Sequence, residues 1–202
     1  MDINCFLIVP DGTTHRYISM QGHNPDACYG HPHRASIRLA DGLVTDNESS
    51  WHMRTPHTMP PSSFPVKCDA CDYMFQWDND TYILDIRHVW VRNDSREFCC
   101  DSIHSAPPGA MWFADWMEDM LNYCGPDGKC LCVMTPGGIW HIDSRASNCG
   151  LPEDNIHKCW VRHGDAPDIT VDKAGNTCNA GAGSISLPGY HGFLRAGKLV
   201  DA

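Results

Sequence analysis

Cysteine and histidine are the residues of this sequence best suited to chemistry, because each supplies a soft donor atom for a metal. The chain has 202 residues, and 12 of them are Cys and 12 are His. Thiolate and imidazole are preferred zinc ligands, and a closed structural zinc site takes four of them in a tetrahedron. The spacing of these residues therefore indicates where zinc could bind.

Cys68 and Cys71 have the two-residue spacing of a zinc knuckle, in which one tight turn directs both thiolates at the same ion. We predict that both are zinc ligands. A pair of unliganded cysteines in a turn is the alternative, whereas a redox motif is disfavoured because no βαβ pattern surrounds the pair. Spacing does not fix the partner ligands, which have candidates on both sides: Cys28, His31, His33, Cys99 and Cys100.

A second group of donors lies in the C-terminal part of the chain, where a loop could wrap around one ion. We predict a zinc site formed by Cys149, His157, Cys159 and Cys178, with His163 as a further candidate. A disulfide between Cys149 and Cys178, with solvated histidines, stays open as an alternative, because cysteine spacing does not distinguish a metal site from a bridge.

Catalysis would need either an open metal position or an activated nucleophile. A site closed by four protein ligands leaves no position for water, and no HExxH motif is present. Cys178 or Ser184 could pair with His191 as nucleophile and base, with Asp168 or Asp172 as the orienting group. We expect no catalytic residue here, and keep a Cys or Ser hydrolase, or a zinc hydrolase, as the alternative.

The pattern of short apolar runs between turn formers predicts a mainly β (α+β) fold of short antiparallel hairpins and long loops around the zinc sites. One hairpin is expected from 5–9 to 16–18, across the turn at 10–12. Another is expected from 130–134 to 139–142. Cys130 and Cys132 alternate on the first strand of this second hairpin and are as suited to a core as to metal ligation.

One helix is predicted over 111–123, after a Pro-Pro-Gly start signal, because Trp112, Trp116 and Met120 fall on one helical face. The aromatic group of Trp112, Phe113 and Trp116 forms either a core anchor or an exposed stripe that binds a host protein. We expect an N-terminal Cys/His-containing β region over 1–110 and a C-terminal Cys/His-rich β region over 111–202, or else one compact domain.

Charge and hydropathy exclude several classes of partner. The net charge is -10 and no basic run exceeds two residues, so we expect no nucleic-acid partner. No apolar run approaches membrane-spanning length, and the first ten residues lack a basic signal-peptide region, so we expect no membrane partner and a reducing cytoplasm. Thiols and zinc thiolates are therefore favoured over disulfides at assembly.

Several segments resemble uncharacterised Cys/His-rich proteins encoded by tailed bacteriophages. The likeness covers about residues 64 to 200, and its most specific stretches are 106–112, 140–149, 157–164, 170–178, 180–185 and 190–194. It implies a phage origin, zinc binding and a place in the host cytoplasm or in the virion. The partners it implies are other phage proteins or a host protein.

These observations together predict a zinc-stabilised, non-enzymatic bacteriophage protein, structural or accessory to the virion. The hydrolase described above is one alternative. An inhibitor or adaptor that binds a host protein through the aromatic stripe is the other.

Overall fold

The computed structural model describes residues 2–22, 32–39, 65–76, 80–151, 153–154, 157–174, 180 and 184–202, with the backbone only at 81–84. The chain divides into two compact units. The large unit consists of Met1–Asp11 and Trp90–Ala202, and the small unit is Gly12–Val89.

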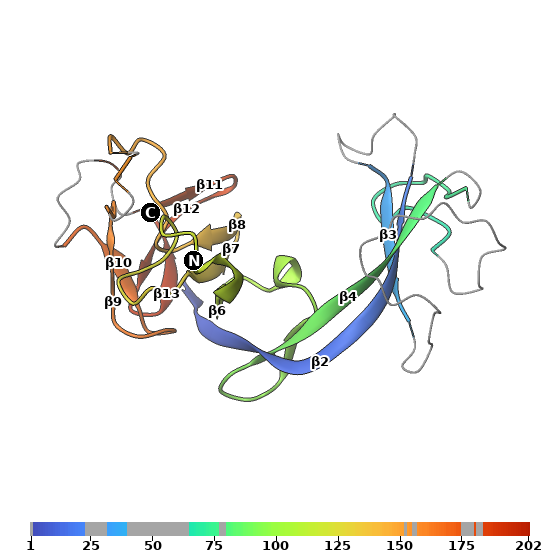
Figure 1. The fold of residues 1–202 in the computed structure, drawn as a ribbon, viewed down its shortest axis with the longest axis horizontal. Coiled ribbons are helices and arrows are strands. Elements are labelled where there is room, and N and C mark those ends of the chain that lie inside the picture. The colour runs from blue at the N-terminus through green and yellow to red at the C-terminus, as the bar shows by residue number, and fades with distance from the viewer. Residues whose placement is uncertain are drawn as a thin grey trace. The chain divides into compact units, whose positions relative to one another are not determined.

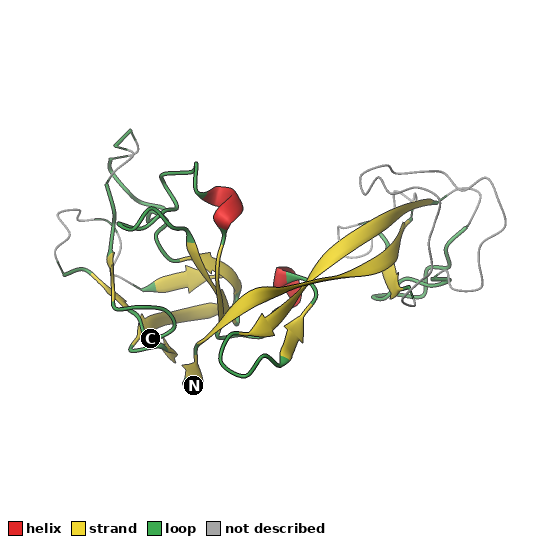
Figure 2. Cartoon of the chain, turned by 60° about the horizontal axis from the view of Figure 1, so that its bottom comes forward, coloured by secondary structure: helices red, strands yellow, loops and turns green. Residues whose placement is uncertain are grey.

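Strands make up nearly all of the regular structure among the described residues, which confirms the mainly β prediction (Figure 1). The only helical segments among them are two short 3-10 turns, visible as the red segments of Figure 2, and neither is long or apolar enough to cross a membrane. The elements are β1 (Ile3–Asn4), β2 (Phe6–Gln21), β3 (Arg34–Arg38), β4 (Thr81–Arg92), β5 (Phe98–Cys100), η1 (Ile103–Ser105), β6 (Ala110–Phe113), η2 (Asp115–Met117), β7 (Leu131–Thr135), β8 (Gly138–His141), β9 (Val161–His163), β10 (Thr170–Asp172), β11 (Ile185–Leu187), β12 (Tyr190–Arg195) and β13 (Lys198–Asp201).

The strands form three sheets. One has the order β1-β13-β12-β11, and a second consists of β10 and β9. The third has the order β5-β4-β2-β6-β7-β8, with β3 paired to β2. Among the strand pairs whose register the structure describes, all are antiparallel except β2 with β6, which is parallel.

Two hairpins with short loops lie in the C-terminal part, and the sequence predicted the first of them. β7 and β8 pair with Thr135 opposite Gly138, so the predicted hairpin between 130–134 and 139–142 is confirmed. β12 and β13 meet at Arg195 and Lys198, and the turn residues Ala196 and Gly197 both have positive φ, as a type I′ turn requires. The short loops fix the register of each pair.

Two apolar clusters form the core of the large unit, and the side-chain alternation of the strands explains them. In β12, Tyr190, Gly192 and Leu194 are buried while His191 and Arg195 are exposed, which is the period of two expected for a half-buried strand. The first cluster includes Leu131, Ile142, Cys159, Ile169 and Leu194. The second includes Ile8, Trp112, Cys124, Cys130 and Cys132.

The small unit buries a compact set of side chains beneath β2 and β3. Ile18, Met20, Ala35 and Leu39 are all buried, and Met20 lies directly opposite Ala35 in the strand register. The start of β3 lies next to the turn at 65–76, because the Asp69 amide donates to the Arg34 carbonyl at 3.0 Å.

The hairpin predicted from 5–9 to 16–18 is wrong. β2 runs without interruption through the Pro-Asp-Gly sequence, where Gly12 adopts a φ of +90°. β2 lies between β4 and β6 in the sheet, and this pairing outweighs the local turn preference.

The helix predicted over 111–123 is also wrong. Residues 110–113 form β6, whose Met111 pairs with Val133, and only a 3-10 turn follows. Trp112 is 1% exposed and Trp116 is 59% exposed, so these two residues do not share a face. Strand pairing on both sides of β6 outweighs the helical spacing.

Candidate metal centres

Three donors of the small unit converge on one point. His33, Cys68 and Cys71 have their ligand atoms within 4.8 Å of one another, and Cys71 Sγ lies 3.2 Å from His33 Nδ1. His33 is 6% exposed and Cys68 is 5% exposed, so the donors are largely withdrawn from water. We call this group the His33 cluster.

A knuckle turn brings the two cysteines of the His33 cluster together. Lys67 and Met74 form an isolated antiparallel bridge, and the Cys68 amide donates to the Tyr73 carbonyl at 2.9 Å. Inside this closed turn, the Ala70 amide points at Cys68 Sγ at 3.5 Å. This is the arrangement by which a zinc knuckle presents two sulfurs to one ion.

Packing fixes the imidazole of the His33 cluster in place. The Tyr73 ring stacks on the His33 ring with centroids 4.0 Å apart and planes 4° apart. The Tyr73 hydroxyl donates to both carboxylate oxygens of Asp80, at 3.0 and 3.1 Å. Gly22 allows this approach, because a Cβ there would lie 2.9 Å from the Tyr73 ring and 3.0 Å from the His33 Cβ.

Electrostatics favours the thiolate at Cys68. Burial by itself raises the pKa of Cys68, but hydrogen bonds from the Ala70 amide, the Arg34 backbone and the His33 side chain outweigh it and lower the pKa to about 6. The group is therefore mostly ionised at neutral pH, which is the form that binds metal.

The second set of donors lies in the large unit. Cys149, His157 and Cys159 have ligand atoms within 4.8 Å of one another, and Cys159 Sγ lies 3.8 Å from His157 Nε2. Cys159 is fully buried in the first core cluster, and Cys149 packs against that cluster. We call this group the Cys159 cluster.

Local turns deliver the ligands of the Cys159 cluster. The Cys149 amide donates to the Ala146 carbonyl at 3.0 Å, closing one turn. The His157 amide donates to Asp154 at its carbonyl, 3.2 Å away, and at its side-chain Oδ1, 3.1 Å away. Cys159 lies two residues before β9 begins, so His157 and Cys159 come from one short segment and Cys149 from another.

Both clusters fit a tetrahedral zinc ion. With Zn–S bonds of about 2.3 Å and Zn–N bonds of about 2.0 Å, the donor atoms of a tetrahedron lie roughly 3.5 to 3.8 Å apart. The sulfur to nitrogen distances of 3.2 Å in the His33 cluster and 3.8 Å in the Cys159 cluster lie close to this range. Each cluster supplies three donors, and the predicted ligand Cys178 and the candidates Cys28 and His31 lie outside the described residues.

The remaining predicted candidates are placed elsewhere. His163 Nε2 lies 2.9 Å from Asp172 Oδ1 across the β9–β10 pair. Cys99 and Cys100 belong to the second core of the large unit.

The structure does not bring together a nucleophile and a base for the hydrolase alternative in the part of the chain that it describes. His191 is exposed on β12 and lies directly opposite Ser186, whereas Ser184 precedes β11. No side-chain hydrogen bond joins Ser184 and His191 among the described residues. Cys178 lies outside these residues.

Sequence reasoning missed a close pair of sulfurs. Cys124 Sγ and Cys130 Sγ lie 2.9 Å apart in the second core of the large unit. The signal available in the sequence was the Gly-Pro-Asp-Gly turn between them, which brings its two ends together.

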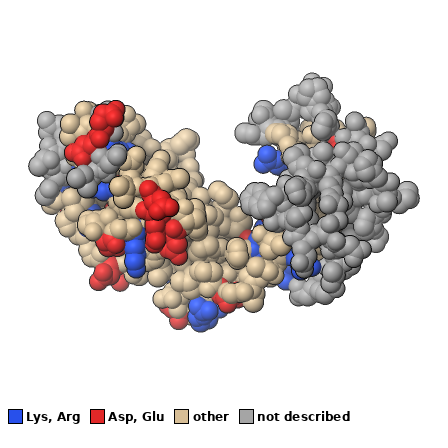
Figure 3. Space-filling view, viewed as in Figure 1, with Lys and Arg blue, Asp and Glu red and all other residues tan. Residues whose placement is uncertain are grey.

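Charged side chains of both signs are mixed on the face shown in Figure 3, and the described residues form no broad area there in which only Lys and Arg gather.

Comparisons of the chain with protein-family models, with curated proteins and with solved structures find no match. The resemblance to phage proteins therefore stays a prediction, and the two clusters are interpreted from their own geometry.

Proposed function

We propose that this is a non-enzymatic protein whose two units are each held by one structural zinc ion. The observation that carries the proposal is the convergence of three Cys and His donors in each unit, in two clusters built from different segments. Convergence of this kind within 4.8 Å occurs twice among the described residues.

The donor set supports zinc. Each cluster contains two sulfurs and one imidazole nitrogen and contains no carboxylate. Calcium and magnesium prefer oxygen ligands, whereas mixed sulfur and nitrogen sites of tetrahedral shape are typical of zinc.

A structural role follows from the surroundings of the ligands. Cys159 is 0% exposed and Cys68 is 5% exposed, so both sulfurs lie in the protein interior. A fourth ligand, Cys178 in the large unit and Cys28 or His31 in the small unit, would close each site and leave no position for a reacting water.

Most of the donors lie in segments without regular strand structure, which a bound zinc ion would stabilise. Cys68 and Cys71 lie at 65–76, and the donors of the Cys159 cluster lie at 149 and 157–159, all outside the named strands. Structural zinc binding contributes on the order of 10 kcal/mol to folding, which is comparable with the whole stability of a domain. Zinc would therefore cross-link segments that lie outside the strands.

Metal analysis of single-ligand variants tests the proposal. The purified protein should hold two zinc ions per chain, and Cys71→Ala and Cys149→Ala should each remove one. Cys132→Ala is the matched control, because Cys132 is a buried cysteine that belongs to neither cluster. A folded protein without bound transition metal, or variants that keep both ions, would refute it.

We further propose that the protein acts as a structural or accessory component of a bacteriophage particle. Support comes from the sequence resemblance over residues 64 to 200 and from the acidic net charge of -10, which keeps a protein soluble at high concentration. Mass spectrometry of purified particles should find the chain in stoichiometric amounts. Its absence from particles that carry all other structural proteins would remove this part of the proposal while leaving the zinc sites untouched.

A further inference from the structure

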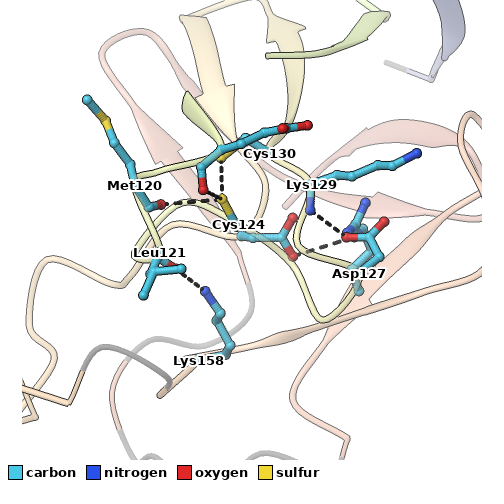
Figure 4. A network of polar contacts seen from close by, with 10 residues as sticks. Met120, Leu121, Cys124, Asp127, Lys129, Cys130 and Lys158 are labelled. Atoms are coloured by element: carbon cyan, nitrogen blue, oxygen red, sulfur yellow. Dashed lines mark hydrogen bonds and ion pairs between the residues drawn. The ribbon is translucent and has the colours of Figure 1, made fainter. Parts of the chain in front are cut away.

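Two buried thiols lie in contact at the two ends of one turn in the large unit. Cys124 is 3% exposed and Cys130 is 2% exposed, and their sulfurs lie 2.9 Å apart (Figure 4). The turn between them is closed by backbone hydrogen bonds from Gly125 to Lys129 at 2.9 Å and from Gly128 to Gly125 at 3.0 Å. The backbone thus holds the two sulfurs next to each other.

Both sulfurs face a ring of backbone carbonyls. Cys130 Sγ donates to the Met117 carbonyl at 3.3 Å, and Cys124 Sγ lies 3.4 Å from the carbonyls of Glu118 and Met120. Burial raises the pKa of Cys130 to about 12, so this sulfur carries its proton at neutral pH and acts as a donor. Figure 4 shows Cys124 at the centre of these contacts.

The pair differs from the two metal clusters in its surroundings. No third Cys, His, Asp or Glu atom completes a metal group with Cys124 and Cys130 among the described residues. The sulfurs are also closer than the roughly 3.8 Å that separates two thiolates on one zinc ion. Metal ligation therefore does not account for their contact.

We propose that Cys124 and Cys130 form a reversible intramolecular disulfide. A disulfide bond is about 2.05 Å long, so the sulfurs need to approach by about 0.9 Å more, which side-chain rotation in a short turn can supply. Formation of the bond joins the two ends of the turn Gly125–Lys129 covalently.

The chemistry is thiol–disulfide exchange with a disulfide reagent such as oxidised glutathione. One protein thiolate attacks the reagent, forms a mixed disulfide and expels one reagent thiolate. The second protein thiolate attacks the protein sulfur of that mixed disulfide and expels the other. The protein sulfurs lose two electrons, the reagent gains them, and the two protons from the protein thiols end on the two released thiols.

Oxidation also changes the contacts of the neighbouring segment. A disulfide sulfur has no proton to donate, so the carbonyls of Met117, Glu118 and Met120 lose their sulfur donors. The Met117 and Met120 carbonyls also accept from the amides of Met120 and Tyr123, both at 2.8 Å, so oxidation exchanges only the weak sulfur contacts for a covalent link.

Peptide mapping of the zinc-loaded full chain tests the proposal directly. The protein is equilibrated in glutathione buffers from reducing to oxidising, alkylated in acid and cleaved after lysine and before aspartate. The peptide 119–126 contains Cys124 as its one cysteine, and the peptide 130–142 contains Cys130 and Cys132. Because cleavage cuts the turn, only a disulfide can keep the two peptides together. Zinc content measured in parallel shows that the metal clusters remain loaded.

We expect the joined peptides to appear as the buffer becomes oxidising and to disappear again on reduction. They should persist in Cys132→Ala and vanish in Cys130→Ala and Cys124→Ala. Full alkylation of both cysteines across the whole buffer range, or a joined product that survives Cys130→Ala, would overturn the proposal. The mapping detects the disulfide in peptides after cleavage, so it can also be applied to a variant with reduced stability.

Discussion

Replacing one buried ligand should abolish the response of the large unit to zinc. Cys159→Ala removes a sulfur from the Cys159 cluster, where it lies 3.8 Å from His157 Nε2. Cys132→Ala removes an equally buried sulfur that belongs to neither cluster. Both variants lose the packing of one sulfur atom in the core, so their difference isolates the metal contribution.

The magnitude follows from binding linkage. A ligand present at a thousand times its dissociation constant stabilises the folded state by about 4 kcal/mol. For a unit of this size that corresponds to roughly 10–15 °C in the melting temperature. We therefore expect a chelator to lower the melting transition of the large unit by this amount in the wild type and in Cys132→Ala.

The assay is thermal unfolding with and without a zinc chelator, followed by near-ultraviolet circular dichroism. Without chelator, the melting temperature of Cys159→Ala should already lie below that of the wild type, and chelator should not lower it further. An equal chelator shift in Cys159→Ala and the wild type would refute the assignment of Cys159 as a ligand. The absence of any shift in the wild type would refute metal stabilisation of the large unit altogether.

Three further outcomes are expected. Gly22→Ala should weaken zinc binding by the His33 cluster and cost about 1–3 kcal/mol, because the new Cβ would lie 2.9 Å from the Tyr73 ring; competition with a chromophoric chelator measures this. Burial raises the pKa of Asp143 to about 6. Between about pH 4 and 6 the Asp143 carboxyl is therefore protonated in the folded state and ionised in the unfolded state. The free energy of unfolding should fall by roughly 2–3 kcal/mol as the pH rises through this window. Urea titrations measure this slope, and Asp143→Asn should remove it. Oxidation of Cys124 and Cys130 closes a seven-residue loop and should raise the urea midpoint by an amount equivalent to about 2 kcal/mol.

Controls for these variants come from the same chain. Gly150→Ala adds a Cβ that meets nothing within 4 Å and lies in the other unit, so it should leave zinc binding by the His33 cluster unchanged. Asp127 is a suitable contrast for Asp143, because its pKa is lowered: burial alone would raise it, but hydrogen bonds and Arg162 outweigh burial. Its contribution to stability should be lost as pH falls below its normal range, which is the opposite slope.

The sequence predicted those strands whose boundaries are marked by local chemistry. The hairpin at Thr135–Gly138 follows from a Pro-Gly turn between two apolar runs. Neither the unbroken course of β2 through Gly12 nor the strand at Met111 could be predicted in this way, because both depend on neighbours in the sheet that come from distant parts of the chain. Helical spacing of tryptophans was misleading for the same reason.

The candidate sites show a similar limit. The knuckle at Cys68 and Cys71 is a local turn, so its spacing predicted that the two sulfurs would lie together. The choice of His33 among the possible partners needed the pairing of β2 with β3, which places the start of β3 against the knuckle. The contact between Cys124 and Cys130 depends on a turn whose closure shows only in the backbone hydrogen bonds.

Local backbone form decides what each close pair of cysteines can do. Cys130 and Cys132 flank Leu131 in extended chain, where two residues advance by roughly 6.6 Å. Both side chains are buried in the second core of the large unit, and among the described residues neither belongs to a group of three metal donors. A turn has the opposite effect, since it folds Cys68 towards Cys71, and a longer turn folds Cys124 onto Cys130. Histidine then separates the two outcomes: the turn that meets His33 has three donors and fits a metal, whereas the turn that meets only carbonyls has two thiols and fits a disulfide.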